Sequence, residues 1–128
     1  MLTAAEIADA KKRVKYPYAS VLHEHDDSVR IAYQWLDAQT TTKRKLRRAY
    51  PLKEIVEIWG GRYVASFDVA VAAEIHPQIR GTYPQFNISP RLTLPSDHRL
   101  TGIAEARTQD YLLTAAHIIQ IYRRIEEP

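Results

Sequence analysis

Apolar residues recur at intervals of three or four along most of this 128-residue chain. This spacing is typical of helices that bury one face. From the spacing and from the flanking residues, we predict helices over these ranges: Ala4–Lys15, Ser28–Gln39, Pro51–Gly60, Phe67–His76 and Ala104–Glu126. The predicted fold class is mainly α with a minor β element (α+β), in one small helical domain that spans residues 1–128.

The residues in front of the helices predict where each helix begins. Thr3 and Glu6 fit a capping box, in which each side chain accepts a hydrogen bond from the amide of the other residue. The other expected N-caps are Asp26, Asp27 or Ser28 for the second helix and Ser66 for the fourth. A short turn from Asp97 to Leu100 is expected after a cap by Ser96.

The second predicted helix, Ser28–Gln39, is the one we expect at the centre of the core. Its apolar stripe is widened by Ile31 and Trp35, so apolar side chains cover much of its circumference. A helix of this kind is usually enclosed by other elements.

The stretch Pro51–Pro77 predicts two helices separated by Gly60 and Gly61, a layout that resembles a helix-turn-helix. The second of these helices holds Asp68 and Glu74 but no arginine or lysine. A helix that reads the major groove normally brings hydrogen-bond donors or amides to the bases. We therefore expect this helix to pack against the protein and other residues to contact a nucleic acid.

Residues 86–94 alternate between apolar and polar side chains, which favours a short β wing or edge strand. Pro90 excludes a central position in a sheet. In the alternative interpretation, Ser89 caps a helix whose first residue is Pro90. We favour the strand.

Composition restricts the class of protein. The chain contains no cysteine, which excludes disulfides and thiolate chemistry. It shows neither the apolar core of a signal peptide nor an apolar run near the roughly 20 residues that span a bilayer. We therefore expect a cytoplasmic location and no contact with membranes.

The basic residues are unevenly distributed, although the net charge is only +3. Between Asp37 and Glu54 lie six basic residues and no acidic one. Five of them form a basic arm near residues 40–50, namely Lys43, Arg44, Lys45, Arg47 and Arg48. Such a segment is either a solvated loop or an anion contact, and it suits phosphates because binding releases condensed counterions from DNA.

A second acid-free stretch runs from Ile75 to Ser96. It contains Asn87 and Arg91, whose side chains lie on the polar side of the predicted strand. We predict that these two residues, with Arg62 in the linker between the third and fourth helices, contact bases or the nucleic-acid backbone.

No pattern in the chain is typical of an enzyme or of a metal protein. The chain has no phosphate-binding glycine loop, no serine nucleophile elbow and no paired-histidine zinc helix. The segment His23–Asp27 offers two alternating histidines, but a stable site needs a third or fourth ligand. We expect this segment to be a polar loop before the second helix. We expect no catalytic residue, no metal and no cofactor.

Two functions fit these patterns. The favoured hypothesis is a small nucleic-acid-binding regulator or accessory protein that binds duplex DNA through the basic arm and the wing. The alternative is a protein-binding adaptor or inhibitor that acts by occlusion, for example on a nucleic-acid-processing partner. In either case the wide apolar surface of the last predicted helix suits a homodimer interface.

Overall fold

The computed structural model describes residues 1–15, 22–47, 50–111 and 120–127. Over these residues the protein is a small, mainly helical domain with four α-helices and a few short strands. The elements in chain order are α1 (Ala4–Arg13), α2 (Asp26–Asp37), α3 (Leu52–Gly60), α4 (Ser66–Ile75), β1 (Gly81–Thr82), β2 (Gln85–Phe86), β3 (Thr93–Leu94), the 3-10 helix η2 (Asp97–Leu100) and β4 (Arg124–Ile125).

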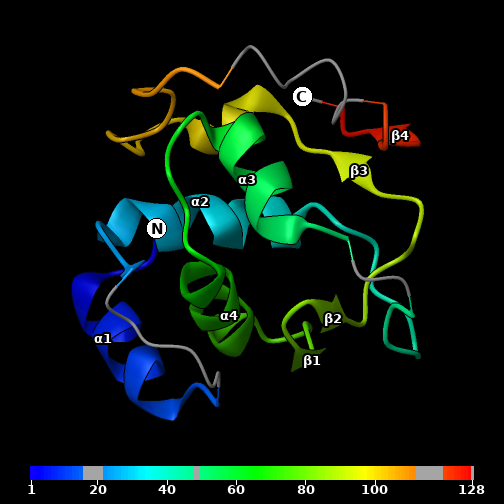
Figure 1. Cartoon of the computed structure of the whole chain (residues 1–128), viewed down its shortest axis with the longest axis horizontal. Coiled ribbons are helices and arrows are strands. Elements are labelled where there is room, and N and C mark those ends of the chain that lie inside the picture. The colour runs from blue at the N-terminus through cyan, green and yellow to red at the C-terminus, as the bar shows by residue number, and fades with distance from the viewer. Residues whose placement is uncertain (16–21, 48–49, 112–119, 128) are drawn as a thin grey trace.

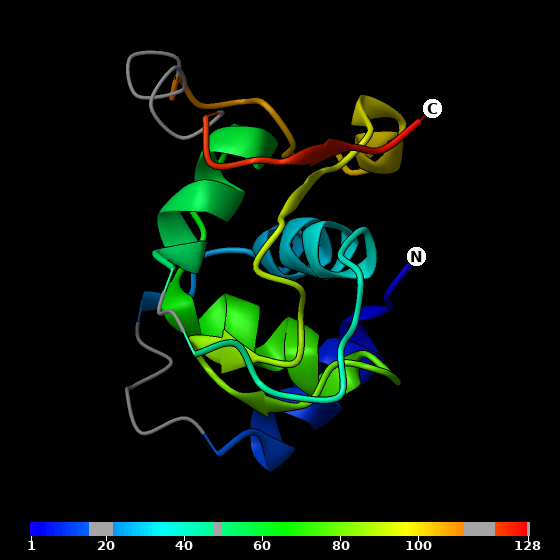
Figure 2. The same cartoon turned by 90° about the vertical axis from the view of Figure 1, so that its right-hand side faces the viewer.

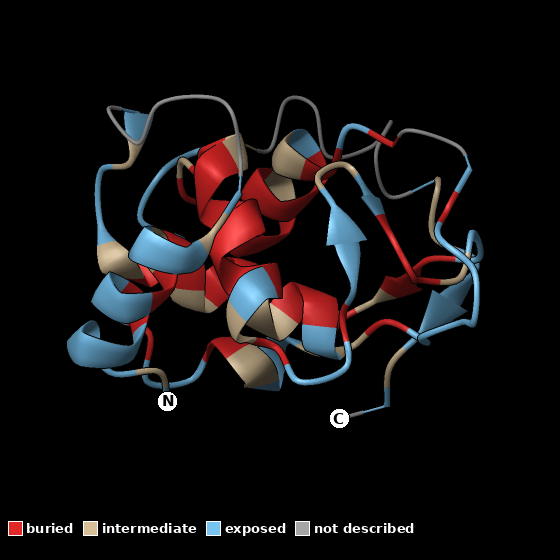
Figure 3. Ribbon diagram, turned by 90° about the horizontal axis from the view of Figure 1, so that it is seen from below, coloured by how far each residue is buried: buried red, intermediate tan, exposed pale blue. Residues whose placement is uncertain are grey.

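Helix α2 lies at the centre of the helical arrangement, as its wide apolar stripe predicts. It packs against α3 on one side and α4 on the other, and α4 also packs against α1 (Figure 1). Viewed from below, the central helices are largely buried whereas α1 exposes much of its surface (Figure 3). Trp35, Ile31 and Leu36 of α2 are fully buried.

Helix α1 begins as predicted. Thr3 Oγ1 accepts a hydrogen bond from Glu6 N at 3.1 Å, and Glu6 Oε1 accepts one from Thr3 N at 3.1 Å. These two bonds satisfy amides that have no partner within the helix.

The predicted caps of α2 and α4 are wrong. Helix α2 begins at Asp26, and His25 Nδ1 accepts a hydrogen bond from Asp27 N at 2.9 Å. Helix α4 begins at Ser66, and the carboxylate of Asp68 accepts a hydrogen bond from Ala65 N at 2.8 Å. In both helices another polar side chain satisfies the free amide, so the helix begins earlier than expected.

The two glycines after Trp59 end α3 as predicted, and each is required for a different reason. Gly61 has a φ of 60°, in the left-handed region that favours glycine. A Cβ atom on Gly60 would lie 2.4 Å from Ile31 Cγ2, so Gly60 allows α3 to approach α2 closely. The break between α3 and α4 is therefore also a packing contact.

The β structure around residues 86–94 is present but is divided between two small sheets. Strand β2 pairs antiparallel with β1, whereas β3 pairs parallel with β4. Between them, Ile88 forms an isolated antiparallel bridge with Thr41. The single continuous strand was wrong, and the alternative helix beginning at Pro90 is not formed. The expected turn from Asp97 to Leu100 is confirmed as η2, with Ser96 Oγ accepting a hydrogen bond from His98 N at 3.2 Å.

The predicted helix Ala104–Glu126 is wrong at both described ends, while residues 112–119 lie outside the described residues. Near its start, Arg107 N donates to Gly60 O at 2.6 Å and Gln109 N donates to Gly61 O at 2.8 Å. Near its end, residues 124 and 125 form β4. Backbone groups at both ends are thus paired with distant segments instead of within a helix. The predicted homodimer relied on the apolar surface of this long helix, so it no longer has that support. It stays a prediction.

The segment that contains β4 is held to the core by side chains on either side of the strand. Trp35 Nε1 donates to the hydroxyl of Tyr122 at 2.9 Å, and burial raises the pKa of Tyr122 to about 12. Beyond the strand, Glu126 accepts two hydrogen bonds of 2.6 Å from the guanidinium of Arg99. In the described part of the chain, no helix is long and apolar enough to cross a membrane.

We expect Trp35→Ala to reduce the free energy of unfolding by about 3–5 kcal/mol, because a fully buried indole would be replaced by a cavity. Tyr122→Phe should cost less, about 1–3 kcal/mol, because it leaves only the Trp35 indole N–H without its acceptor. Chemical denaturation measures both values. A loss below about 1 kcal/mol for Trp35→Ala would contradict the central position of this side chain.

A second prediction concerns pH. The hydrogen bonds from Arg99 lower the pKa of Glu126 below its ordinary value of 4.5. A carboxylate whose pKa is lowered by folding stabilises the protein above its ordinary pKa, and this contribution is lost as the pH falls through the folded value. Glu126→Gln should therefore lower the Tm at neutral pH and make the Tm less sensitive to acid below pH 4.5. Glu127→Gln, an exposed neighbour with the same charge change, is the control. Equal effects of the two substitutions would contradict the prediction.

Candidate nucleic-acid interface

The described residues of the basic arm form an exposed loop. The side chains of Lys43, Arg44, Lys45 and Arg47 are all exposed, while Leu46 between them is buried. Within the ranges that the structure describes, none of the four basic side chains forms an ion pair with an acidic residue. Arg48 lies outside the described residues. The loop thus presents uncompensated positive charge to the solvent.

Backbone hydrogen bonds hold both ends of this loop on the second acid-free stretch. Thr42 N donates to Asn87 O at 2.8 Å, and Leu46 N donates to Phe86 O at 2.7 Å. One step earlier, Ser89 N donates to Thr40 O at 2.8 Å. Both segments lie on the face of the molecule that is turned toward the viewer in Figure 2. The two stretches without acidic residues, separate in the sequence, are therefore side by side in the structure.

Asn87 connects these segments instead of presenting its amide to the solvent. Its Oδ1 accepts a hydrogen bond from Arg80 N at 2.6 Å, and its Nδ2 donates to Gln78 O at 3.0 Å and to Thr42 O at 3.4 Å. The residue is only 9% exposed. Its side chain therefore supports the base of the loop, where we had predicted a contact with bases.

Arg91 lies at the surface next to this base. Its backbone N donates to Ser89 Oγ at 3.1 Å, and Ser89 is itself bonded to Thr40. The residue is exposed, and its side chain makes no ion pair with a described acidic residue. Of the three residues predicted outside the basic arm, Arg91 is the one that remains on the surface beside it.

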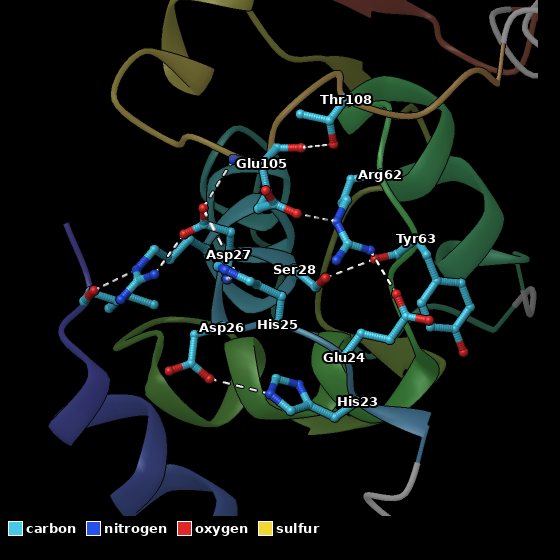
Figure 4. Close-up of polar contacts among 12 residues, drawn as sticks. His23, Glu24, His25, Asp26, Asp27, Ser28, Arg62, Tyr63, Glu105 and Thr108 are labelled. Atoms are coloured by element: carbon cyan, nitrogen blue, oxygen red, sulfur yellow. Dashed lines mark hydrogen bonds and ion pairs between the residues drawn. The ribbon is translucent and has the colours of Figure 1, made fainter.

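Arg62 is buried in a polar cluster with the loop that precedes α2 (Figure 4). Its guanidinium donates to Glu24 at 2.8 Å and to Glu105 at 3.0 Å. The hydrogen bond with Glu24 raises the pKa of Arg62 further. This cluster lies on the opposite side of the molecule from the basic loop (Figure 1). The structure therefore does not bring Arg62 together with the other predicted contacts.

The segment His23–Asp27 forms the rest of this polar cluster. The ring of His23 contacts the carboxylate of Asp68 through Nδ1, and its Nε2 lies 3.0 Å from Lys11 Nζ. Asp27 accepts hydrogen bonds from Arg30 at 2.6 Å and from Glu105 N at 3.1 Å. Among the described residues, no group of three or more potential ligands is arranged to hold a metal ion. The arrangement joins loops to helices.

Asp68 is the residue of this cluster whose role the sequence analysis missed. It is fully buried, and burial raises the pKa of its carboxyl, although hydrogen bonds from His23 and Ala65 N act in the opposite direction. The available signal was a carboxylate at the second residue of the fourth predicted helix, directly before a run of small, apolar residues. A buried carboxylate requires polar partners, and His23 was the partner that could not be identified from spacing.

Helix α4 has almost no surface with which to enter a groove. Its residues from Phe67 to Ala73 are all buried, and Glu74 is its one exposed residue. This agrees with the expectation that α4 packs against the protein. This helix therefore offers almost no side chain for contact with a nucleic acid.

The chain matches no protein-family model, no curated protein sequence and no solved structure.

We expect Arg62→Gln to destabilise the fold by about 1–3 kcal/mol, because it removes charge-assisted hydrogen bonds between three loops. It should leave unchanged the dependence of nucleic-acid affinity on salt, because this side chain is not at the basic loop. Thermal denaturation and binding at several salt concentrations separate the two effects. If the variant instead loses part of the salt dependence of its nucleic-acid affinity while its Tm is unchanged, Arg62 belongs to the interface.

Proposed function

We propose that this protein binds nucleic acid, with duplex DNA as the favoured ligand, through the basic loop formed by residues 43–47 and the adjoining Arg91. We call this set the basic surface. The proposal does not require catalysis or a cofactor. It describes a small regulator or accessory protein that recognises the phosphate backbone.

The observation that supports this proposal most directly is the pairing of the two acid-free stretches. Backbone hydrogen bonds join residues 86–89 to Thr40, Thr42 and Leu46. Neither of the two paired segments contains an acidic residue. Cations that have no acidic neighbour keep their counterions until a polyanion replaces them. The four basic side chains of the loop repel one another, and a bound polyanion would offset this electrostatic repulsion.

The manner in which the loop is held also favours this function. Hydrogen bonds fix Thr42 and Leu46, so residues 43–45 project from a defined base. A preformed loop loses less conformational entropy on binding than a free tail. Phosphate contacts of this kind fix position and carry no sequence information by themselves. Arg91 is the remaining predicted residue with a side chain free to reach a base edge.

The helix-turn-helix interpretation is retained only in a reduced form. In our proposal α3 and α4 act as a scaffold, because α4 is buried from Phe67 to Ala73. The wing is represented by the segment from Phe86 to Arg91, on which the loop is held.

The test is the salt dependence of binding to a short DNA duplex. Each phosphate contact contributes about −0.9 to the slope of log affinity against log salt concentration. Replacing Lys43, Arg44, Lys45 and Arg47 by glutamine should therefore flatten this slope by about three to four units. Affinity should fall for all sequences alike, and the Tm should change little because exposed charges contribute little to stability.

A matched pair of variants controls for net charge. Lys43→Gln with Lys45→Gln removes two charges from the loop, while Lys12→Gln with Lys15→Gln removes two exposed charges at α1. We expect the first pair alone to flatten the slope, by about two units. Equal effects of the two pairs would show that only total charge matters. Absence of binding by the unmodified protein to duplex DNA, single-stranded DNA and RNA at low salt would overturn the proposal.

A further inference from the structure

We infer that the C-terminal segment contributes two further contacts, Arg123 and Arg124, to the same surface, so that phosphates are bound by two parts of the chain that are distant in sequence. This inference rests on the proposed function. It names a binding element that the sequence pattern assigned to a helix and not to the interface.

The position of β4 brings these arginines to the base of the basic loop. Arg123 N and Arg124 N both donate to Leu92 O, at 2.9 and 3.2 Å. The side chain of Arg124 extends further and donates from Nη1 to Thr40 Oγ1 at 3.0 Å. Thr40 is the residue whose carbonyl accepts the hydrogen bond from Ser89 N. One residue therefore joins β4, the Ser89 segment and the beginning of the loop.

Two anchored side chains of the C-terminal segment lie on either side of the exposed cations. Tyr122 bonds to the buried Trp35, and Glu126 bonds to Arg99. Arg123 and Arg124 between them are exposed. Arg123 Nη1 donates to the carbonyl of Gln120 at 2.5 Å, which holds its guanidinium near the backbone while its charge stays unneutralised. The anchors fix the strand, and the arginines face the solvent.

The acidic residues nearest in the sequence do not neutralise these arginines in the described structure. Glu126 is engaged by Arg99 and by Ser96 N, and its partner Arg99 also binds Asp37. Glu127 is exposed and forms no ion pair with a described residue. Arg91, which directly precedes Leu92 in the sequence, is a third exposed cation on this part of the chain. The ligand that fits is a polyanion with repeated phosphates, because several separate cations lie around the base of the basic loop.

The experiment uses the full-length protein and a short DNA duplex. We expect the double substitution Arg123→Gln with Arg124→Gln to flatten the salt slope by about two units, and to do so in addition to the effect of the loop substitutions. The matched variant Arg123→Lys with Arg124→Lys keeps both charges and should keep most of the slope. The variant Lys12→Gln with Lys15→Gln again controls for net charge. The variants keep Tyr122 and Glu126, which hold this segment to the core, so their Tm should change little. Thermal denaturation checks this.

Each outcome decides between the two levels of the proposal. If the unmodified protein does not bind, the proposed function fails and this inference fails with it. If the loop variant loses salt dependence while the Arg123/Arg124 variant binds like the unmodified protein, the function stands and the inference alone is overturned. If inorganic polyphosphate binds with the same slope and competes fully with the duplex at equal phosphate concentration, the surface recognises phosphate chains in general, and the assignment to nucleic acid is overturned.

Discussion

The buried carboxylate of Asp68 is the constraint on which much of the fold depends. A charge or acid with no exposure to water is costly unless polar groups surround it. Its partners are the amide of Ala65, which directly precedes α4, and the ring of His23, which precedes α2. Meeting this requirement fixes the loop from His23 to Asp27 against α4. That loop in turn supplies Glu24 to Arg62 and Asp27 to the backbone of Glu105. Chain segments from three regions are therefore held by one chain of polar contacts.

Two kinds of polar residue have different roles on the two sides of the molecule. Around Asp68, charged groups meet opposite charges, and Asp27, Arg62 and Asp68 themselves are buried. Along the surface formed by residues 40–47 and 86–92, charged side chains remain exposed, and the hydrogen bonds between the two segments are made by backbone groups and by Asn87. The first arrangement stabilises the fold. The second leaves cations available without requiring them for folding, which is the property that a binding surface needs.

The apolar pattern was sufficient to predict the four helices, because it marks the buried side of α1, α2 and α3 and continues along the whole buried stretch of α4 from Phe67 to Ala73. It failed for the C-terminal segment, where Tyr122 has the spacing of a helical residue but reaches Trp35 from an extended chain. The basic arm was also recognisable, since a run of like charge is a local feature. Arg62 and Asn87 were interpreted as surface residues because their partners could not be recognised in the sequence. Glu105 is distant from Arg62 in the chain, and Asn87 bonds to the backbone carbonyl of Gln78, which no sequence pattern marks. Local signals thus identified elements, while pairing across the fold decided which polar residues remain free.

Thr42 and Leu46 are bonded to the adjacent residues Asn87 and Phe86, and this has a consequence for how the protein can vary. Because both ends of the loop are held, residues 43–45 can change in number or identity without altering the register between residues 40–42 and 87–89. Surface loops held by a rigid scaffold tolerate such changes far better than the elements that carry them. The length and charge of this loop can therefore be changed while the rest of the fold is kept. Residues 43–45 are therefore a suitable site at which to insert another sequence into this fold.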